Sequence, residues 1–309
     1  MAKSGVDWAT DSWSPMSGCS HAGSPSCDAC YARSMAIRFA GGKVFPNGFD
    51  VTLFPERLEQ PLHWKKPRNV FVCPTGDLFH DDVPFEFIEQ VVHHTQYARQ
   101  HIYQFLTKRA ERMAAFWCWF SNRNCIDPDS PDLPYPNVWL GVTAENQEMA
   151  DERIPVLLQV PAAVHWVSIE PMLGPMMLEN YFSYSDYCPG HDWGDPGYPP
   201  IECSFCEHHP GVDWIVVGGE SGPKARPTNP NWVRSIRDQC QAVGAPFYMK
   251  QWGCWVSPDN YGFDIGAPDI SLCKRHVFPD GQEVYRTGKK FAGHMLDGKE
   301  WRQFPGDVK

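Results

Sequence analysis

Three cysteines near the start of the chain have the types and spacing that most clearly point to chemistry. Cys19, Cys27 and Cys30 form a C-x7-C-x2-C pattern in a segment rich in Gly, Ser and Pro, directly before a stretch with helical character. Thiolates bind zinc and iron–sulfur clusters. A [4Fe-4S] cluster takes four protein ligands, so three cysteines would leave one iron open to a substrate or cofactor. The spacing therefore predicts a metal centre with one vacant position.

Zinc is the alternative at this site, with His21 as the fourth ligand beside the three cysteines, and a chance grouping without metal is the third reading. The first residues contain no apolar run typical of a signal peptide, and the chain has no apolar stretch of about 18 residues. We therefore expect a cytoplasmic protein without membrane contact. Clustered cysteines in a reducing compartment bind metals more often than they form disulfides.

A second group of potential ligands lies in a long segment, residues 179–211, rich in aromatic residues, Pro and Gly. It comprises Cys188, His191, Cys203 and Cys206. Paired ligands separated by two residues are typical of structural zinc sites, which hold together loops that cannot form a core of their own. We predict a zinc site here, with an auxiliary iron–sulfur cluster or no metal as the alternatives. The segment is expected to cover the active site as a lid or recognition element.

Short apolar runs alternate with helical patterns along most of the chain. The runs lie at 69–73, 102–106, 138–142, 164–169, 212–217 and 246–249. Continuous apolar strands separated by helices indicate a parallel sheet, and roughly six such units fit a full or partial (β/α) barrel. We predict an α/β barrel domain over residues 1–251, including the insertion, and an irregular C-terminal extension over residues 252–309 packed on it.

Two further expectations concern the first quarter of the chain. Residues 1–31 are expected to form loops, and residues 55–64 have apolar spacing that predicts a helix.

Charged residues follow the ends of the apolar runs. They are Asp77, Lys108, Glu145, Glu170, Glu220 and Lys250. The carboxyl ends of barrel strands form one rim, and active sites are built there. We therefore expect these side chains to border one pocket. The formal net charge of -10 argues against a protein that coats nucleic acid through a basic surface, but it is compatible with an enzyme that binds one nucleotide.

Several segments together resemble one protein family over nearly the whole chain. They are Trp13-x-Pro15-x-x-Gly18-Cys19, Cys27-x-x-Cys30-Tyr31-Ala32, Gly76-Asp77-Leu78-Phe79-His80, Leu106-Thr107-Lys108-Arg109, Trp139-Leu140-Gly141-Val142-Thr143-x-Glu145-Asn146, Ser168-Ile169-Glu170-Pro171-Met172-Leu173, Gly218-Gly219-Glu220-Ser221-Gly222, Lys250-Gln251-Trp252-Gly253 and Leu296-Asp297-Gly298 followed by Trp301. The chain resembles a phage and prophage family whose displaced three-cysteine motif is similar to that of radical S-adenosylmethionine (SAM) enzymes. The spacing departs from their usual C-x3-C-x2-C, and Ala29 stands where an aromatic residue usually precedes the third cysteine.

The resemblance implies a [4Fe-4S] cluster on Cys19, Cys27 and Cys30, with SAM bound to the open iron and cleaved to a 5′-deoxyadenosyl radical. It implies an electron donor such as flavodoxin or ferredoxin, and a phage-infected or prophage-bearing bacterial host. The expected substrate is nucleic acid or a modified nucleoside, specifically an amino-acid-modified thymidine of phage DNA that the enzyme rearranges.

The resemblance also implies roles for the residues after the strands. The catalytic residues would be Asp77, Lys108, Glu145 and Glu170. The cofactor-binding residues would be Asp77, Glu170, Gly218, Gly219, Glu220, Ser221 and Lys250. Either Asp77 or Glu220 would contact the amino group of SAM. Two other functions are the alternatives: a non-catalytic zinc-binding module for nucleic acid or a host protein, and a SAM-dependent lyase that repairs DNA bases.

Overall fold

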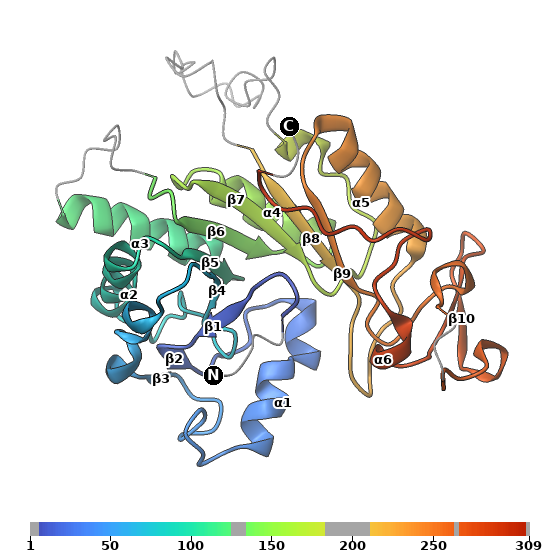
Figure 1. Ribbon diagram of the computed structural model, residues 1–309, viewed down its shortest axis with the longest axis horizontal. Helices are drawn as coiled ribbons and strands as arrows, with labels where there is room; N and C mark the ends of the chain where they lie inside the picture. Colours follow the sequence, from blue (N-terminus) through green and yellow to red (C-terminus); the bar gives the residue numbers. More distant parts are fainter. Residues whose placement is uncertain (1–5, 125–133, 183–210, 263–265, 307–309) are drawn as a thin grey trace.

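Parallel strands form one curled sheet, an α/β half-barrel (Figure 1). The computed structural model describes residues 6–124, 134–182, 211–262 and 266–306. Within these residues the sheet has seven strands in the order β1-β4-β5-β6-β7-β8-β9, and every neighbouring pair is parallel. The strands are β1 Asp11–Trp13, β4 Asn69–Val72, β5 Ile102–Thr107, β6 Val138–Thr143, β7 Val164–Ile169, β8 Trp214–Gly218 and β9 Phe247–Gln251. The predicted fold class is confirmed.

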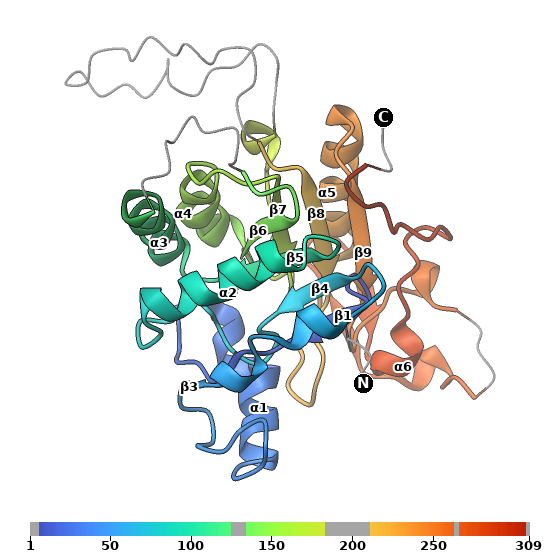
Figure 2. The ribbon, with the colours of Figure 1, turned by 60° about the vertical axis from the view of Figure 1, so that its left-hand side comes forward.

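Helices cover the convex face of the sheet (Figure 2). They are α2 Phe85–Tyr97, α3 Ala110–Arg123, α4 Gln147–Leu157 and α5 Pro230–Val243. Their starts follow the sequence: Asn146 caps α4 by accepting a hydrogen bond from the Met149 backbone at 3.0 Å, and Asn229 caps α5 in the same way. Helix α5 ends at Gly244, whose φ of 70° is left-handed. No described helix is long and apolar enough to cross a membrane.

Both faces of the sheet are buried, and alternate residues of each strand face opposite sides. Val138, Leu140 and Val142 of β6 pack under the helices in the main core, whereas Trp139 faces the concave side. That concave side is filled by aromatic rings from several strands: Phe71, Trp139, Trp166, Trp214 and Tyr248. Since apolar side chains point both ways, the strands appear in the sequence as unbroken apolar runs.

Two local expectations were wrong. Residues 11–13 form β1 and pair with β4, with Asp11 opposite Val70, although the segment was expected to be loop. The strand is a short, largely polar edge strand, so it lacks an apolar run. Residues 55–64 form two short 3₁₀ turns, Pro55–Arg57 and Gln60–His63, in place of one helix. Pro61 within the segment has no N–H to donate, which interrupts an α-helix.

Smaller elements complete the N-terminal and C-terminal parts. They are α1 Tyr31–Arg38, the two-stranded pair β2 Met16–Ser17 and β3 Thr52–Leu53, the hairpin β10 Arg275–Val277 and β11 Glu283–Tyr285, and α6 Lys289–Ala292. Helix α1 begins directly after Cys30, in the stretch with helical character that follows the cysteines. The C-terminal extension contacts the sheet edge, because the Met249 backbone of β9 donates to the Trp301 carbonyl at 2.8 Å. A domain division at residue 252 stays a prediction.

Buried histidines make the stability of this fold depend on pH. Burial lowers the pKa of His101 and His165 below the ordinary value of 6.5. The folded protein therefore binds fewer protons than the unfolded chain near pH 6, and stability is lost as the pH falls below about 6.5. We expect the melting temperature of the metal-free protein to fall between pH 7.5 and 5.5. His101→Gln should reduce that slope, and an unchanged slope in this variant would contradict the assignment.

Candidate active site at the carboxyl end of the sheet

A cavity of about 890 Å³ lies at the carboxyl ends of the strands, between the sheet and the loop that carries the three cysteines. Cys19, Cys27 and Cys30 all line it. The predicted strand-end residues that line it are Asp77, Lys108, Glu170, Gly219, Glu220, Ser221 and Lys250. The sheet therefore brings together residues from positions 19 to 250, as a parallel barrel does at its carboxyl rim.

The cysteine loop, residues 19–30, is built from short pieces. Cys19 follows β2, Cys27 lies in the 3₁₀ turn Pro25–Ala29, and Cys30 immediately precedes α1. All three are free, partly exposed thiols. The Tyr31 hydroxyl, at the start of α1, donates to the Pro74 carbonyl after β4 and so ties the loop to the sheet.

Arg109 contacts the first cysteine. Its Nη1 lies 3.4 Å from Cys19 Sγ and 3.1 Å from Asp77 Oδ2, and its Nη2 donates to Ser20 Oγ at 3.0 Å. Burial raises the pKa of Cys19 to about 11, with a further contribution from Asp77, while Arg109 opposes the shift. A metal ion would have to displace the proton, since metals bind the thiolate.

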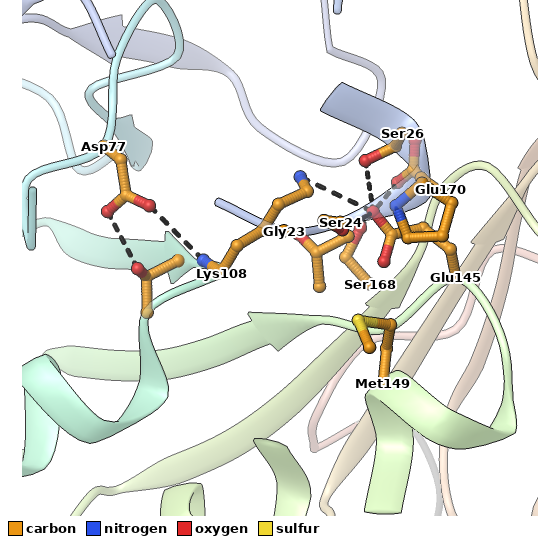
Figure 3. A network of polar contacts seen from close by, with 12 residues as sticks. Gly23, Ser24, Ser26, Asp77, Lys108, Glu145, Met149, Ser168 and Glu170 are labelled. Carbon is orange, nitrogen blue, oxygen red and sulfur yellow. Dashed lines mark hydrogen bonds and ion pairs between the residues drawn. The ribbon is translucent and has the colours of Figure 1, made fainter. Parts of the chain in front are cut away.

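The carboxylate of Asp77 is fully occupied by hydrogen bonds. Oδ1 accepts from the Phe79 backbone at 3.0 Å and from Thr107 Oγ1 at 2.8 Å. Oδ2 accepts from the Lys108 backbone at 3.3 Å (Figure 3). It also accepts from Arg109 Nη1 at 3.1 Å. An ionised carboxylate has about four acceptor sites. Asp77 therefore holds the turn after β5 to the loop after β4 with its whole acceptor capacity.

Glu145, after β6, is completely buried and contacts the cysteine loop (Figure 3). Its Oε1 accepts from Ser24 Oγ at 2.5 Å and from Ser26 Oγ. Arg153 of α4 lies 3.4 Å from Oε2, and Lys108 Nζ lies 3.9 Å from Oε1. Arg153 is itself 1 % exposed and donates to the Thr143 carbonyl at 2.7 Å. Glu145 does not line the cavity, but Ser26 and Lys108 do.

Glu220, after β8, is paired with Arg226. The Arg226 backbone and Nε donate to Oε2 at 2.7 and 2.8 Å, and Nη2 donates to Oε1 at 2.6 Å. The same Nη2 lies 3.1 Å from the Pro25 carbonyl, so this pair also reaches the cysteine loop.

Glu170 and Lys250 form an ion pair on the cavity wall, from the ends of β7 and β9. Trp8 Nε1 donates to Glu170 Oε1 at 3.2 Å, and Lys250 Nζ lies 5.9 Å from the centre of the Trp8 ring. Ser168 Oγ lies 3.5 Å from the same carboxylate oxygen. Both side chains of this pair are partly exposed, at 17 % for Lys250 and 15 % for Glu170.

Glycines at the ends of β8 and β9 allow two backbone segments to meet closely. A Cβ at Gly219 would lie 2.1 Å from the Trp252 carbonyl oxygen, and a Cβ at Gly253 would lie 2.2 Å from the Glu220 carbonyl oxygen. A Cβ at Gly218 would lie 3.2 Å from the Glu170 carboxylate. These contacts account physically for Gly218, Gly219 and Gly253, which lie beside Glu220 and Lys250 in the two motifs.

The ligand geometry distinguishes the metal sites considered above. Within the described ranges, no three His, Cys, Asp or Glu side chains are placed to hold one metal ion. His21 Nε2 lies 3.2 Å from Asp28, and His21 Nδ1 accepts from the Gly23 backbone at 3.1 Å. Both nitrogens of the proposed fourth zinc ligand are thus engaged. The second predicted group, Cys188, His191, Cys203 and Cys206, lies outside the described residues.

Sequence reasoning missed several residues of the site. They are Trp8, Ser24, Ser26, Arg109, Arg153 and Arg226. Arg109 was within a recognised motif, and its place next to Lys108 at a strand end was an available signal. Trp8 and Arg153 had none, because their partners lie far away in the sequence. Cys73 also lines the cavity, at a left-handed φ of 55°.

Comparisons with known proteins give a family and two similar structures. A cysteine-to-serine variant of spore photoproduct lyase aligns with a TM-score of 0.41 and 9% identity, over 94% of this chain and 71% of that one. A cysteine-to-alanine variant of spore photoproduct lyase with dinucleoside spore photoproduct aligns with a TM-score of 0.38 and 9% identity, over 89% of this chain and 67% of that one. The fold assignment rests on the strand order and register described above.

No curated protein matches the sequence. A family profile matches residues 3–305, which is nearly the entire chain. The chain therefore belongs to the family described as protein of unknown function (DUF5131).

Proposed function

We propose that this protein is an enzyme that binds a [4Fe-4S] cluster on Cys19, Cys27 and Cys30 and SAM in the adjoining cavity. One observation carries the proposal: three free thiols of a single loop line the same cavity as charged residues from successive strand ends. The resemblance of the motifs to radical SAM enzymes supports the same assignment.

The donor set is of the type that a [4Fe-4S] cluster binds, namely cysteine thiols. The three thiols line one wall of a shared cavity. A zinc ion draws four ligands to one point at about 2.3 Å from each sulfur. The cysteines of a cluster bind different irons and so lie further apart. His21, the fourth zinc ligand considered, has both ring nitrogens engaged.

When bound, the cluster would supply the electron that cleaves the carbon–sulfur bond of SAM. The chain's own residues would bind and orient the reactants. Glu170, Lys250 and Lys108 are charged residues of the cavity wall and are candidates for this task. The alternatives for the SAM amino group differ: Asp77 has its acceptor sites filled, whereas Glu220 accepts three hydrogen bonds and keeps about one site. We therefore favour Glu220 over Asp77.

The substrate belongs to the same proposal. The resemblance favours an amino-acid-modified thymidine in phage DNA, and a damaged DNA base is the alternative. Cavity residues Arg33 and Lys289, in α1 and α6, would give an anionic nucleotide two further positive contacts. Incubation with each class of nucleoside would show which one is consumed together with SAM.

The metal assignment is tested by anaerobic purification and reconstitution. We expect about four irons per chain in the native sequence. Cys19→Ala, Cys27→Ala and Cys30→Ala should each lose most of this iron. Cys118→Ala, at an exposed position on α3, is the matched control and should retain it. A colourless protein that contains only zinc would end the proposal in favour of a zinc-binding module.

A further inference from the structure

The seven residues between the first two cysteines lie across the strand ends. This spacer, residues 20–26, begins at Ser20, whose Oγ lies 2.7 Å from His80 Nε2, after β4, and accepts from Arg109, after β5. Further along, the Pro25 carbonyl accepts from Arg226, between β8 and α5. The spacer therefore contacts both sides of the cavity rim.

The centre of the spacer is held by a buried ion pair. Ser24 and Ser26 both donate to Glu145, after β6, and Arg153 lies on the other carboxylate oxygen. Ser24, Glu145 and Arg153 are between 0 % and 1 % exposed. A buried carboxylate needs hydrogen-bond partners, and the two serine hydroxyls supply part of that need. The ion pair and the spacer are thus mutually dependent.

We propose that Glu145 and Arg153 are positioning residues that hold the spacer across the strand ends and thereby place Cys27 and Cys30. The proposal rests on the proposed function, in which these two cysteines bind the cluster. This assigns Glu145 a role other than the catalytic one expected from its place after β6. Two observations support the reassignment: Glu145 is absent from the described residues that line the cavity, and its hydrogen-bond partners lie in the cysteine loop and α4, with Lys108 as a more distant charge at 3.9 Å.

The proposal also explains the long cysteine spacing. The spacer must extend from the β4–β5 side of the rim to the β8 side before the second cysteine. Cys27 follows directly after Ser26, and the Cys27 backbone donates to the Ser24 carbonyl at 2.9 Å. A movement of the serines therefore moves the second thiol and, through the turn Pro25–Ala29, the third.

The test is hydrogen–deuterium exchange of the metal-free protein, with Ser24→Ala/Ser26→Ala as the variant. Exchange in peptides covering residues 20–30 should become about tenfold faster, because hydrogen bonds to a charged group stabilise the closed loop. Peptides of β6 and β7 should exchange as in the native sequence, since neither serine lies in the sheet. An unchanged rate in the spacer would overturn the proposal.

Two single variants serve as controls. Ser34→Ala, in α1, removes a hydroxyl that donates to the Cys30 carbonyl of its own helix, and it should leave spacer exchange unchanged. Ser26→Thr keeps a hydroxyl at a partly exposed position. Its spacer should exchange at the native rate, whereas the spacer of Ser26→Ala should exchange faster. A Ser26→Thr variant as fast as Ser26→Ala would show that the hydroxyl does not hold the spacer.

Measuring iron retention distinguishes a failure of the positioning role from a failure of the cluster assignment. If the native protein binds the cluster, Ser24→Ala/Ser26→Ala should lose iron about tenfold faster on transfer to a chelator. Faster spacer exchange in a protein that never binds iron would support the positioning role and refute the cluster. Normal exchange and iron retention in the variant would refute the positioning role and leave the cluster in place.

Discussion

Replacing Arg153 by methionine is expected to lower the free energy of unfolding by about 3–5 kcal/mol. Arg153 and Glu145 are 1 % and 0 % exposed, so the substitution removes the nearer cation from a buried carboxylate and leaves only Lys108, 3.9 Å from Oε1. Methionine fills similar volume, which confines the effect mainly to the lost charge and its hydrogen bond to the Thr143 carbonyl. Urea denaturation of the metal-free protein measures the loss.

Two comparisons make this prediction specific. Arg275→Met removes a surface partner of Glu283 and should unfold at the native midpoint, because solvent screens exposed pairs. Glu145→Gln combined with Arg153→Met removes both charges and should recover part of the stability lost by Arg153→Met alone. If the double variant loses the sum of the two single effects, the residues do not act as a pair.

Gly219→Ala is expected to destabilise the fold by about 3 kcal/mol, at the upper end for overpacking. The added Cβ would lie 2.1 Å from the Trp252 carbonyl oxygen and 2.6 Å from its carbonyl carbon. These are backbone atoms, which cannot move aside as a flexible side chain could. Because the Gly219 backbone also donates to the Gln251 carbonyl at 2.8 Å, the two segments cannot separate without losing this bond. Thermal denaturation is the measurement.

The matched control for this prediction is Gly174→Ala, also in a loop after a strand. A Cβ at Gly174 would have its nearest neighbour, Asn146 Cβ, at 3.8 Å, which is ordinary contact. We expect Gly174→Ala to have a stability close to that of the native protein. The added methyl group fits, and alanine lowers the conformational entropy of the unfolded chain, which favours folding. Equal effects of the two substitutions would contradict the close approach of residues 219 and 252.

The sheet could be predicted because its strands are buried on both faces. The run at 164–169 matches β7 residue for residue, and Asn146 and Gly244 mark the start of α4 and the end of α5. The strand β1 could not be predicted in this way, since a short polar edge strand carries no apolar signal. Its existence depends on pairing with β4, far away along the chain.

The position of the site could be predicted from the sequence, but the contacts between its residues could not. The charged residues after the strands, except Glu145, do border one cavity, as expected at the carboxyl rim of a parallel barrel. Their partners depend on long-range contacts: Ser24 and Glu145 are 121 residues apart, and Arg226 and Pro25 are 201 apart. Spacing in the sequence says nothing of such pairs. Glu145 therefore had the position of a catalytic residue while its contacts are those of a positioning residue.

The central claim is that a cluster on Cys19, Cys27 and Cys30 has an open iron that binds SAM. The most direct test is electron paramagnetic resonance of the anaerobically reduced protein before and after SAM is added, with 5′-deoxyadenosine measured in the same sample. We predict a [4Fe-4S] signal that changes when SAM is added, together with formation of 5′-deoxyadenosine. A reduced cluster whose spectrum does not respond to SAM, with no 5′-deoxyadenosine, would contradict the claim.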